Sequence, residues 1–149
     1  HTNDAPSTIT RLQNMGTPDY LISAACQLVL AQRLARKNCN DCRVPDDDVN
    51  PKVLQDLGFS AEMASRVKAI KGKGCPKCSN TGYKGRQGIY EILVISKPIK
   101  EAILRKATTP ELREIGIKEG FQTMQDMGRR LIAAGELNFR EYERVLSSE

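Results

Sequence analysis

The sequence has few aromatic residues and no long apolar run. It contains no Trp, and aromatic residues make up only 5% of its 149 residues. The stacking platforms that bind single-stranded nucleic acids are therefore scarce. The longest mostly apolar stretch, residues 21–31, is broken by Ser23 and Gln27 and is far short of the roughly 20 residues that cross a bilayer. With 40% hydrophobic and 28% charged residues, we expect a soluble globular protein without a transmembrane segment.

The sequence also lacks the common motifs of a self-sufficient enzyme. It has no G-x-x-x-x-G-K-[ST] phosphate loop, and its single histidine, His1, is the first residue and has no partner visible in sequence. The chain opens "HTNDAPSTIT", with neither an initiator Met nor a signal peptide. We therefore expect a fragment or a processed chain that is inactive by itself.

What the sequence does have is two C-x-x-C pairs among its five cysteines. An odd number of cysteines without a secretory signal argues against a disulfide framework and indicates a reducing compartment. In such a compartment two C-x-x-C pairs predict a closed, tetrahedral zinc site. The alternative is ordinary buried or redox-active thiols. The predicted zinc ligands are Cys39, Cys42, Cys75 and Cys78, and Cys26 is expected to be a small core residue.

The net charge is moderately basic. The formal value is +5, and it falls to +3 when four thiolates subtract four charges and a zinc ion adds two. Four cations lie close to the predicted ligands in sequence and should partly balance the site: Lys37, Arg43, Lys73 and Lys77. The positive charge is too diffuse to demand a nucleic acid.

Residues 43–74, between the two cysteine pairs, are long enough to fold as an insert. Asn50 followed by Pro51 is typical of a helix start, and Gly58 follows the predicted helix. Ser60 predicts the cap of a second helix with Met63, Val67 and Ile70 on one face. We expect a helical hairpin whose base is held by zinc.

The other segments predict a mainly helical α+β protein with a small β element. Helices are expected over 4–15 and 18–25, while 29–35 could be a strand or a helix. A glycine-containing turn is expected over 81–88 and a strand over 89–95. The last third predicts short helices over 97–107, 109–120, 124–135 and 139–146, with caps at Thr123 and Asn138, in a compact bundle.

Three stretches resemble the C-terminal part of the secretion ATPase superfamily: "HTNDAPSTITRLQNMG", "LVLAQRLARKNCNDC" and "GCPKCSNTGYKGRQGIYEIL". The likeness is to the GspE/PilB branch (the PulE/GspE family), the motors of type II secretion and type IV pilus assembly. It covers the whole chain, although Phe139 stands where the family often has Thr. The resemblance places His1, beside Thr2 and Asn3, in the family's His box near the nucleotide.

The resemblance implies three regions. Residues 1–37 would be the C-terminal remnant of a RecA-like P-loop ATPase domain, 38–80 the tetracysteine zinc-binding subdomain with its helical insert, and 81–149 a strand-turn followed by the C-terminal helical domain. Separated from most of its sheet, the first region is expected to be remodelled, poorly ordered or covered by another copy.

The parent implied by the resemblance is a cytoplasmic homo-hexamer that uses ATP and Mg²⁺ to assemble pilin or pseudopilin subunits. It would lie at the inner membrane through platform and adaptor proteins. The chain itself would be a structural, zinc-stabilised docking region. The alternatives are a zinc-ribbon nucleic-acid-binding module and a chaperone-like zinc domain, since "CPKCSNTG" resembles a DnaJ-type repeat whose glycine spacing it does not keep.

Overall fold

A computed structural model of the chain describes residues 3–147 and has an α+β fold, which confirms the predicted class. Its elements are α1 (Ala5–Asn14), α2 (Asp19–Ala25), β1 (Leu28–Asn38), β2 (Arg43–Pro45), α3 (Pro51–Asp56), α4 (Ala61–Arg66), β3 (Ile70–Gly72), the 3-10 turn η1 (Pro76–Cys78), β4 (Tyr83–Val94), α5 (Lys97–Leu104), α6 (Thr109–Lys118), α7 (Met124–Ala133) and α8 (Phe139–Leu146). No helix in the described part of the chain is long and apolar enough to cross a membrane.

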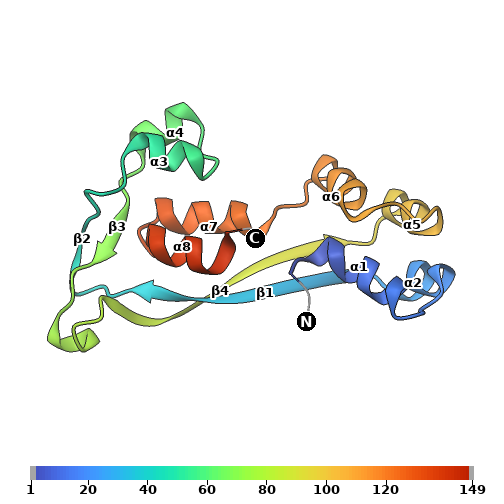
Figure 1. Ribbon diagram of the computed structural model, residues 1–149, viewed down its shortest axis with the longest axis horizontal. Helices are drawn as coiled ribbons and strands as arrows, with labels where there is room; N and C mark the ends of the chain where they lie inside the picture. The colour runs from blue at the N-terminus through green and yellow to red at the C-terminus, as the bar shows by residue number, and fades with distance from the viewer. Residues whose placement is uncertain (1–2, 148–149) are drawn as a thin grey trace. The chain divides into compact units, whose positions relative to one another are not determined.

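The strands form two separate pairs, β1 with β4 and β2 with β3 (Figure 1). Residues 29–35, for which the sequence left strand and helix open, are therefore part of a strand, β1. This strand continues to Asn38, directly before the first cysteine pair. The predicted turn before β4 is wrong, because β4 already starts at Tyr83. Gly85, with φ of +81°, is accommodated inside the strand, since glycine adopts this conformation at little cost.

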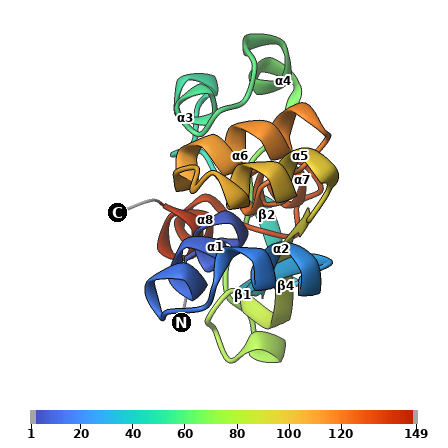
Figure 2. The same cartoon turned by 90° about the vertical axis from the view of Figure 1, so that its right-hand side faces the viewer.

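The chain divides into two compact units, and β1 and β4 contribute to both. Among the described residues, unit 1 comprises residues 3–32 and 90–124, and unit 2 comprises residues 33–89 and 125–147. In unit 1 the helices α1, α2, α5 and α6 pack together (Figure 2). They bury an almost entirely aliphatic core of Ala5, Ile9, Ile22, Val29, Leu93, Ile95, Ile99, Ala102, Ile103, Ala107, Leu112 and Phe121.

The strand segments of unit 1 are apolar on both faces. Val29, Leu93 and Ile95 point into the core, whereas Leu28, Leu30, Ile92 and Val94, which alternate with them, are exposed. Alternation along a strand sends successive side chains to opposite faces. The exposed face of unit 1 therefore carries a row of large aliphatic side chains.

In unit 2 the helical hairpin of α7 and α8 covers the outer edge of β1. The Asn38 amide donates to the Glu136 carbonyl at 2.9 Å, and the Arg36 amide donates to Glu141 Oε2 at 2.5 Å. Asn138 caps α8, as the sequence predicts, by accepting a hydrogen bond from the Glu141 amide at 2.8 Å. Capping this edge satisfies backbone donors that a free strand edge would leave exposed.

The insert begins with the β2–β3 pair, which the sequence did not predict, and carries α3 and α4 beyond it (Figure 1). The predicted caps Asn50 and Ser60 are confirmed. The second helix is shorter than expected, because it ends at Arg66 and Ile70 pairs with Pro45 in the antiparallel β2–β3 ladder. The expected apolar face is therefore wrong, and Met63 is 44% exposed.

Candidate metal centre

The four predicted ligands come from two loops that the strands bring together. Cys39 and Cys42 lie between β1 and β2, and Cys75 and Cys78 lie at the η1 turn between β3 and β4. The η1 turn closes through residues Ser79 and Asn80, whose φ angles of 55° and 61° are left-handed. Both loops thus fold back on themselves at the point where their cysteines meet.

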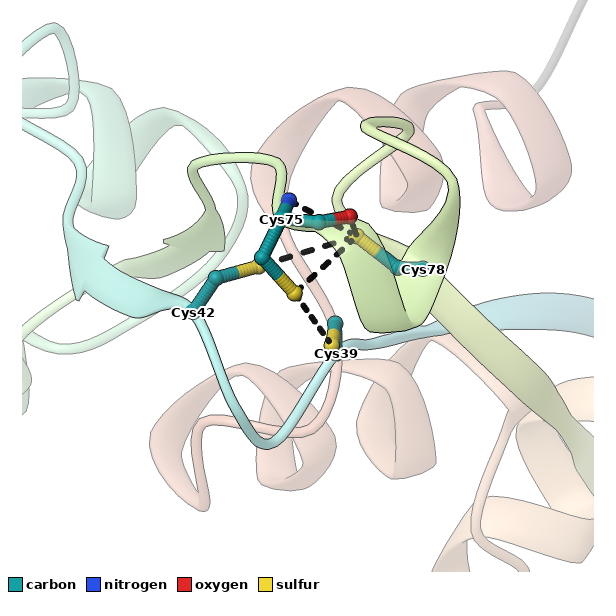
Figure 3. A group of neighbouring side chains, drawn as sticks. All are labelled: Cys39, Cys42, Cys75 and Cys78. Atoms are coloured by element: carbon teal, nitrogen blue, oxygen red, sulfur yellow. Dashed lines mark hydrogen bonds between the residues drawn. The ribbon is translucent and has the colours of Figure 1, made fainter.

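The four Sγ atoms lie within 4.8 Å of one another, and Figure 3 shows them converging on one point. The closest approaches are 3.8 Å for Cys39–Cys75, 3.8 Å for Cys42–Cys78 and 3.7 Å for Cys75–Cys78. These are too long for a disulfide, and all five cysteines are free thiols. A regular tetrahedron with Zn–S bonds of about 2.3 Å has S···S edges of about 3.8 Å. The donor set and its spacing therefore fit a tetrahedral zinc ion.

Backbone amides point at two of the sulfurs. Cys78 Sγ accepts from the amides of Cys75 and Gly82, each at 3.2 Å, and Cys42 Sγ accepts from Gly74 at 3.3 Å. Desolvation raises the pKa of Cys78, but the amide donors outweigh it and bring the pKa to about 6. Desolvation raises the pKa of Cys42 to about 11. The site therefore contains at least one sulfur whose surroundings stabilise the thiolate that a metal requires.

Glycine is required where the segment before the second pair meets the segment after it. A Cβ on Gly72 would lie 1.9 Å from the Gly82 carbonyl oxygen, and a Cβ on Gly74 would lie 3.0 Å from the Asn80 oxygen. Gly74 also has φ of +106°. Residues 72–74 and 80–82 are thus in direct backbone contact, and this contact fixes the second cysteine pair.

Three of the four predicted balancing cations, all except Lys73, form ion pairs with carboxylates of the chain. Lys37 and Arg43 form ion pairs with Glu136 at 3.4 and 3.2 Å, and Lys77 lies 3.4 Å from Asp41. Glu136 was not predicted from the sequence, because it is far along the chain and no spacing pattern connects it with the cysteines. Its carboxylate joins the α7–α8 turn to the strands that lead to the site.

Asn38 is a second residue that the sequence analysis missed. Its buried side-chain amide donates to the carbonyl oxygens of Ile70 at 3.1 Å and Gly135 at 2.9 Å. It therefore connects the residue before Cys39 with β3 and with the end of α7.

A buried carboxylate on α8 completes this polar layer. Glu141 is fully buried and accepts hydrogen bonds from Arg36 and Arg144. Burial raises the pKa of Glu141, but these two guanidinium groups outweigh it and hold the pKa at about 2. The Arg36 guanidinium also lies 4.1 Å from the centre of the Tyr83 ring, a cation–π contact. This network ties α8 to both long strands.

His1 and Cys26 are the two remaining residues for which the sequence predicts a role. His1, assigned to the family's His box, lies outside the described residues. Cys26 is half-buried against the core of unit 1, as expected for a small packing residue, and is not part of the four-cysteine cluster.

Comparison with known proteins identifies the family. The model of the family described as "Type II/IV secretion system protein" matches residues 1–144. The chain belongs to this family. A type IV pilus assembly ATPase PilB from Myxococcus xanthus is 36% identical over 95% of the chain, and a PilB from Thermus thermophilus is 41% identical over 86%. A type II secretion system ATPase E from Vibrio cholerae is 34% identical over 87%.

The match covers only a part of each relative. The aligned region is 25% of the Myxococcus protein, 14% of the Thermus protein and 28% of the Vibrio protein. The chain is thus a fragment when it is compared with these ATPases.

Proposed function

We propose that the chain is the C-terminal part of an ATPase that powers the assembly of pilin or pseudopilin subunits. The support is its family membership and its similarity to pilus assembly and type II secretion ATPases over nearly its whole length. The parent would be a cytoplasmic homo-hexamer that binds ATP and Mg²⁺ largely through residues outside this chain, with His1 at the nucleotide. It would work at the inner membrane through platform and adaptor proteins.

Within that parent, Cys39, Cys42, Cys75 and Cys78 would hold one structural Zn²⁺. The observation that carries this proposal is the set of Sγ–Sγ distances of 3.7–3.8 Å. A four-cysteine site is closed and has no open position for a reacting water. The ion would therefore fix the end of β1, the β2–β3 pair and the start of β4 relative to one another.

The region that the zinc site fixes would dock other components of the machine. The insert helices α3 and α4 have six residues each, too few to be stable as isolated helices. They depend on the packing and anchoring around them, and zinc would supply part of that anchoring. We infer that the insert contacts the membrane platform or a neighbouring protomer.

The decisive experiment measures metal content by elemental analysis, together with a thermal melt before and after a strong chelator. About one zinc per chain with a large loss of stability on chelation would support the structural site, because such sites contribute on the order of 10 kcal/mol to folding. Absence of metal with four titratable thiols and an unchanged melt would refute it. The purified chain should not hydrolyse ATP. Hydrolysis by the chain alone would refute the proposal that most nucleotide-binding residues lie outside it.

A further inference from the structure

The longest segment whose charged residues all have the same sign includes the second cysteine pair of the metal centre. Between Glu62 and Glu91 there is no Asp or Glu, whereas Lys and Arg occur seven times: Arg66, Lys68, Lys71, Lys73, Lys77, Lys84 and Arg86. In the structure these residues extend from α4 through β3 and η1 into β4, all within unit 2. The proposed function uses none of them.

The later cations of this segment lie on the stretches that lead into, form and follow the second cysteine pair. The backbone contact between Gly72 and Gly82 places residues 71–73 beside residues 81–84. Lys73 and Lys84 therefore project from adjoining segments, Lys77 lies on η1, and Arg86 follows two residues after Lys84 on β4. All four are exposed. We call the surface formed by Lys73, Lys77, Lys84 and Arg86 the basic face.

The basic face is only partly neutralised by the chain itself. Lys77 lies 3.4 Å from Asp41, but that is a solvent-exposed pair of the kind that contributes little. Lys73, Lys84 and Arg86 have no carboxylate partner among residues 3–147. Apart from the charge of the four-cysteine site itself, these three exposed cations are therefore available to an external anion.

The neighbouring side chains narrow the class of that anion. Within the described residues, no large hydrophobic side chain is exposed between Met63 and Tyr90, whereas surfaces that bind membranes usually add apolar side chains to their cations. Tyr83 is half-buried and its ring already contacts the Arg36 guanidinium. The aromatic platform that single-stranded nucleic acids need is therefore absent from this surface.

We propose that the basic face docks an acidic segment of a partner polypeptide. Charge complementarity of this kind sets the rate and the specificity of association more than its final affinity. The turn is held by the Gly72–Gly82 contact and by the amide bonds to sulfur, so little backbone ordering remains to oppose binding. This surface lies outside α3 and α4, and its proposed partner chemistry goes beyond the docking role of the insert.

The test uses the whole chain and a short fluorescein-labelled Glu-rich peptide, with affinity measured by fluorescence anisotropy. The variant Lys84→Glu with Arg86→Glu should bind about tenfold more weakly, because two exposed ion pairs are lost and two repulsions replace them. Lys73→Glu should also weaken binding, by a smaller factor. Binding of the unmodified chain should weaken as salt rises through about 0.1–0.15 M, where the Debye length falls from about 10 to about 8 Å.

The matched control reverses two exposed lysines of unit 1, Lys97→Glu with Lys106→Glu, which changes the net charge equally. It should alter peptide affinity less than about twofold if the interaction is local. Equal losses of peptide affinity in the two double variants would overturn the proposal. Tighter binding to single-stranded DNA or to phosphatidylglycerol vesicles than to the peptide would also overturn it. Metal content is measured for every variant, so that a loss of peptide binding through the basic face can be distinguished from a loss of the zinc site. Loss of metal in the Lys84/Arg86 variant with unchanged peptide binding would show that these cations only balance the site, and would also overturn the proposal.

Discussion

The two units of this chain are stabilised in different ways. Unit 1 buries an almost continuous aliphatic core between four helices and two strand segments, and it also buries the side chain of Glu91 at its boundary with unit 2 in the sequence. Unit 2 buries the carboxylate of Glu141 and the amide side chains of Asn38 and Asn138, and it contains the four-cysteine cluster. Apolar burial depends little on pH or on metal, whereas metal-binding thiolates respond to both and buried carboxylates respond to pH.

The exposed surfaces of the two units differ in the same sense as their interiors. Unit 1 exposes a row of large aliphatic side chains on its strands, while unit 2 exposes the basic face. The unit with the apolar core thus also has the more apolar exterior. We expect unit 1 to fold without metal but to associate readily, and unit 2 to remain dispersed but to need its metal.

The largest expected effect is the removal of metal, which should separate the two units. A strong chelator, or Cys39→Ser together with Cys78→Ser, should raise amide hydrogen exchange throughout residues 39–82. Structural zinc sites contribute on the order of 10 kcal/mol, more than the short elements of this region can replace. Protection of α5 and α6 in unit 1 should persist, as measured by hydrogen–deuterium exchange with mass spectrometry.

The control for this experiment is Cys26→Ser, which replaces the one cysteine outside the cluster. Because Cys26 is only half-buried against the core, we expect its replacement to change protection slightly and only in unit 1. Equal loss of protection in α5, α6 and the cysteine loops would show that the two units do not differ in their dependence on metal.

The second effect tests the apolar core of unit 1. Ile103 is fully buried, so Ile103→Ala should destabilise unit 1 by about 2–5 kcal/mol. Ile117 is 51% exposed, and Ile117→Ala should stay within about 0.5 kcal/mol. Urea unfolding of the metal-loaded chain measures both. Similar losses from the two substitutions would contradict the location of the core.

The third effect tests the buried carboxylate of unit 2. Glu141→Gln should destabilise unit 2 by about 1–3 kcal/mol; the loss is smaller than for a fully buried ion pair, because Arg36 and Arg144 are half exposed and can still be hydrated. Since the folded pKa of Glu141 is lowered to about 2 from an ordinary value of 4.5, its contribution is complete above about pH 4.5 and is lost as the pH falls toward 2.

Acid unfolding of the original chain and the Glu141→Gln variant measures this contribution. The difference in stability between the two should be largest at neutral pH and should shrink below about pH 4.5. Asp19→Asn in unit 1 is the control: Asp19 lies in a polar contact on the surface of α1 and α2, and its substitution should leave the stability of unit 2 unchanged. A constant difference down to pH 2 would mean that the Glu141 charge is not what stabilises α8 on β1.

Local chemistry made part of this structure predictable from sequence. The caps at Asn50, Ser60 and Asn138 were predicted because a cap depends only on residues within one turn of helix. The meeting of the four cysteines was predictable because two C-x-x-C pairs in one chain are typical of a metal site. Binding of zinc by these cysteines and the three domain boundaries stay predictions.

The features that the sequence analysis missed depend on distant pairings. β2 and β3 have three residues each, too few to show a period, and they form only because residues 43–45 meet residues 70–72. The start of β4 was misassigned because its glycines resemble a turn until β1 supplies a hydrogen-bonding partner. Glu136 and Asn38 were missed for the same reason, since their roles arise only when α7 and α8 lie against β1.

The smallest expected effect concerns how the insert is fastened to the rest of unit 2. The Arg129 guanidinium on α7 donates to the Leu57 carbonyl oxygen at 3.1 Å, at the C-terminal end of α3. It thus holds the far part of the insert at a second point, away from the cysteine site. Arg129→Met keeps much of the apolar stem but removes this donor together with the ion pair between Arg129 and Asp126, and we expect a loss of about 1 kcal/mol.

Hydrogen exchange tests whether the hydrogen bond between Arg129 and Leu57 helps to hold the insert. If Arg129 holds the insert, exchange in α3 should rise in Arg129→Met while the amides around Cys75 and Cys78 stay protected and metal content stays the same. Arg130→Met, the neighbouring substitution on the same helix, is the control and should leave α3 unchanged. If α3 exchanges equally in both variants and the original chain, the β2–β3 pair and the metal site alone would determine how the insert is held. The dependence of unit 2 on metal would then be complete, and the contrast with unit 1 would be sharper still.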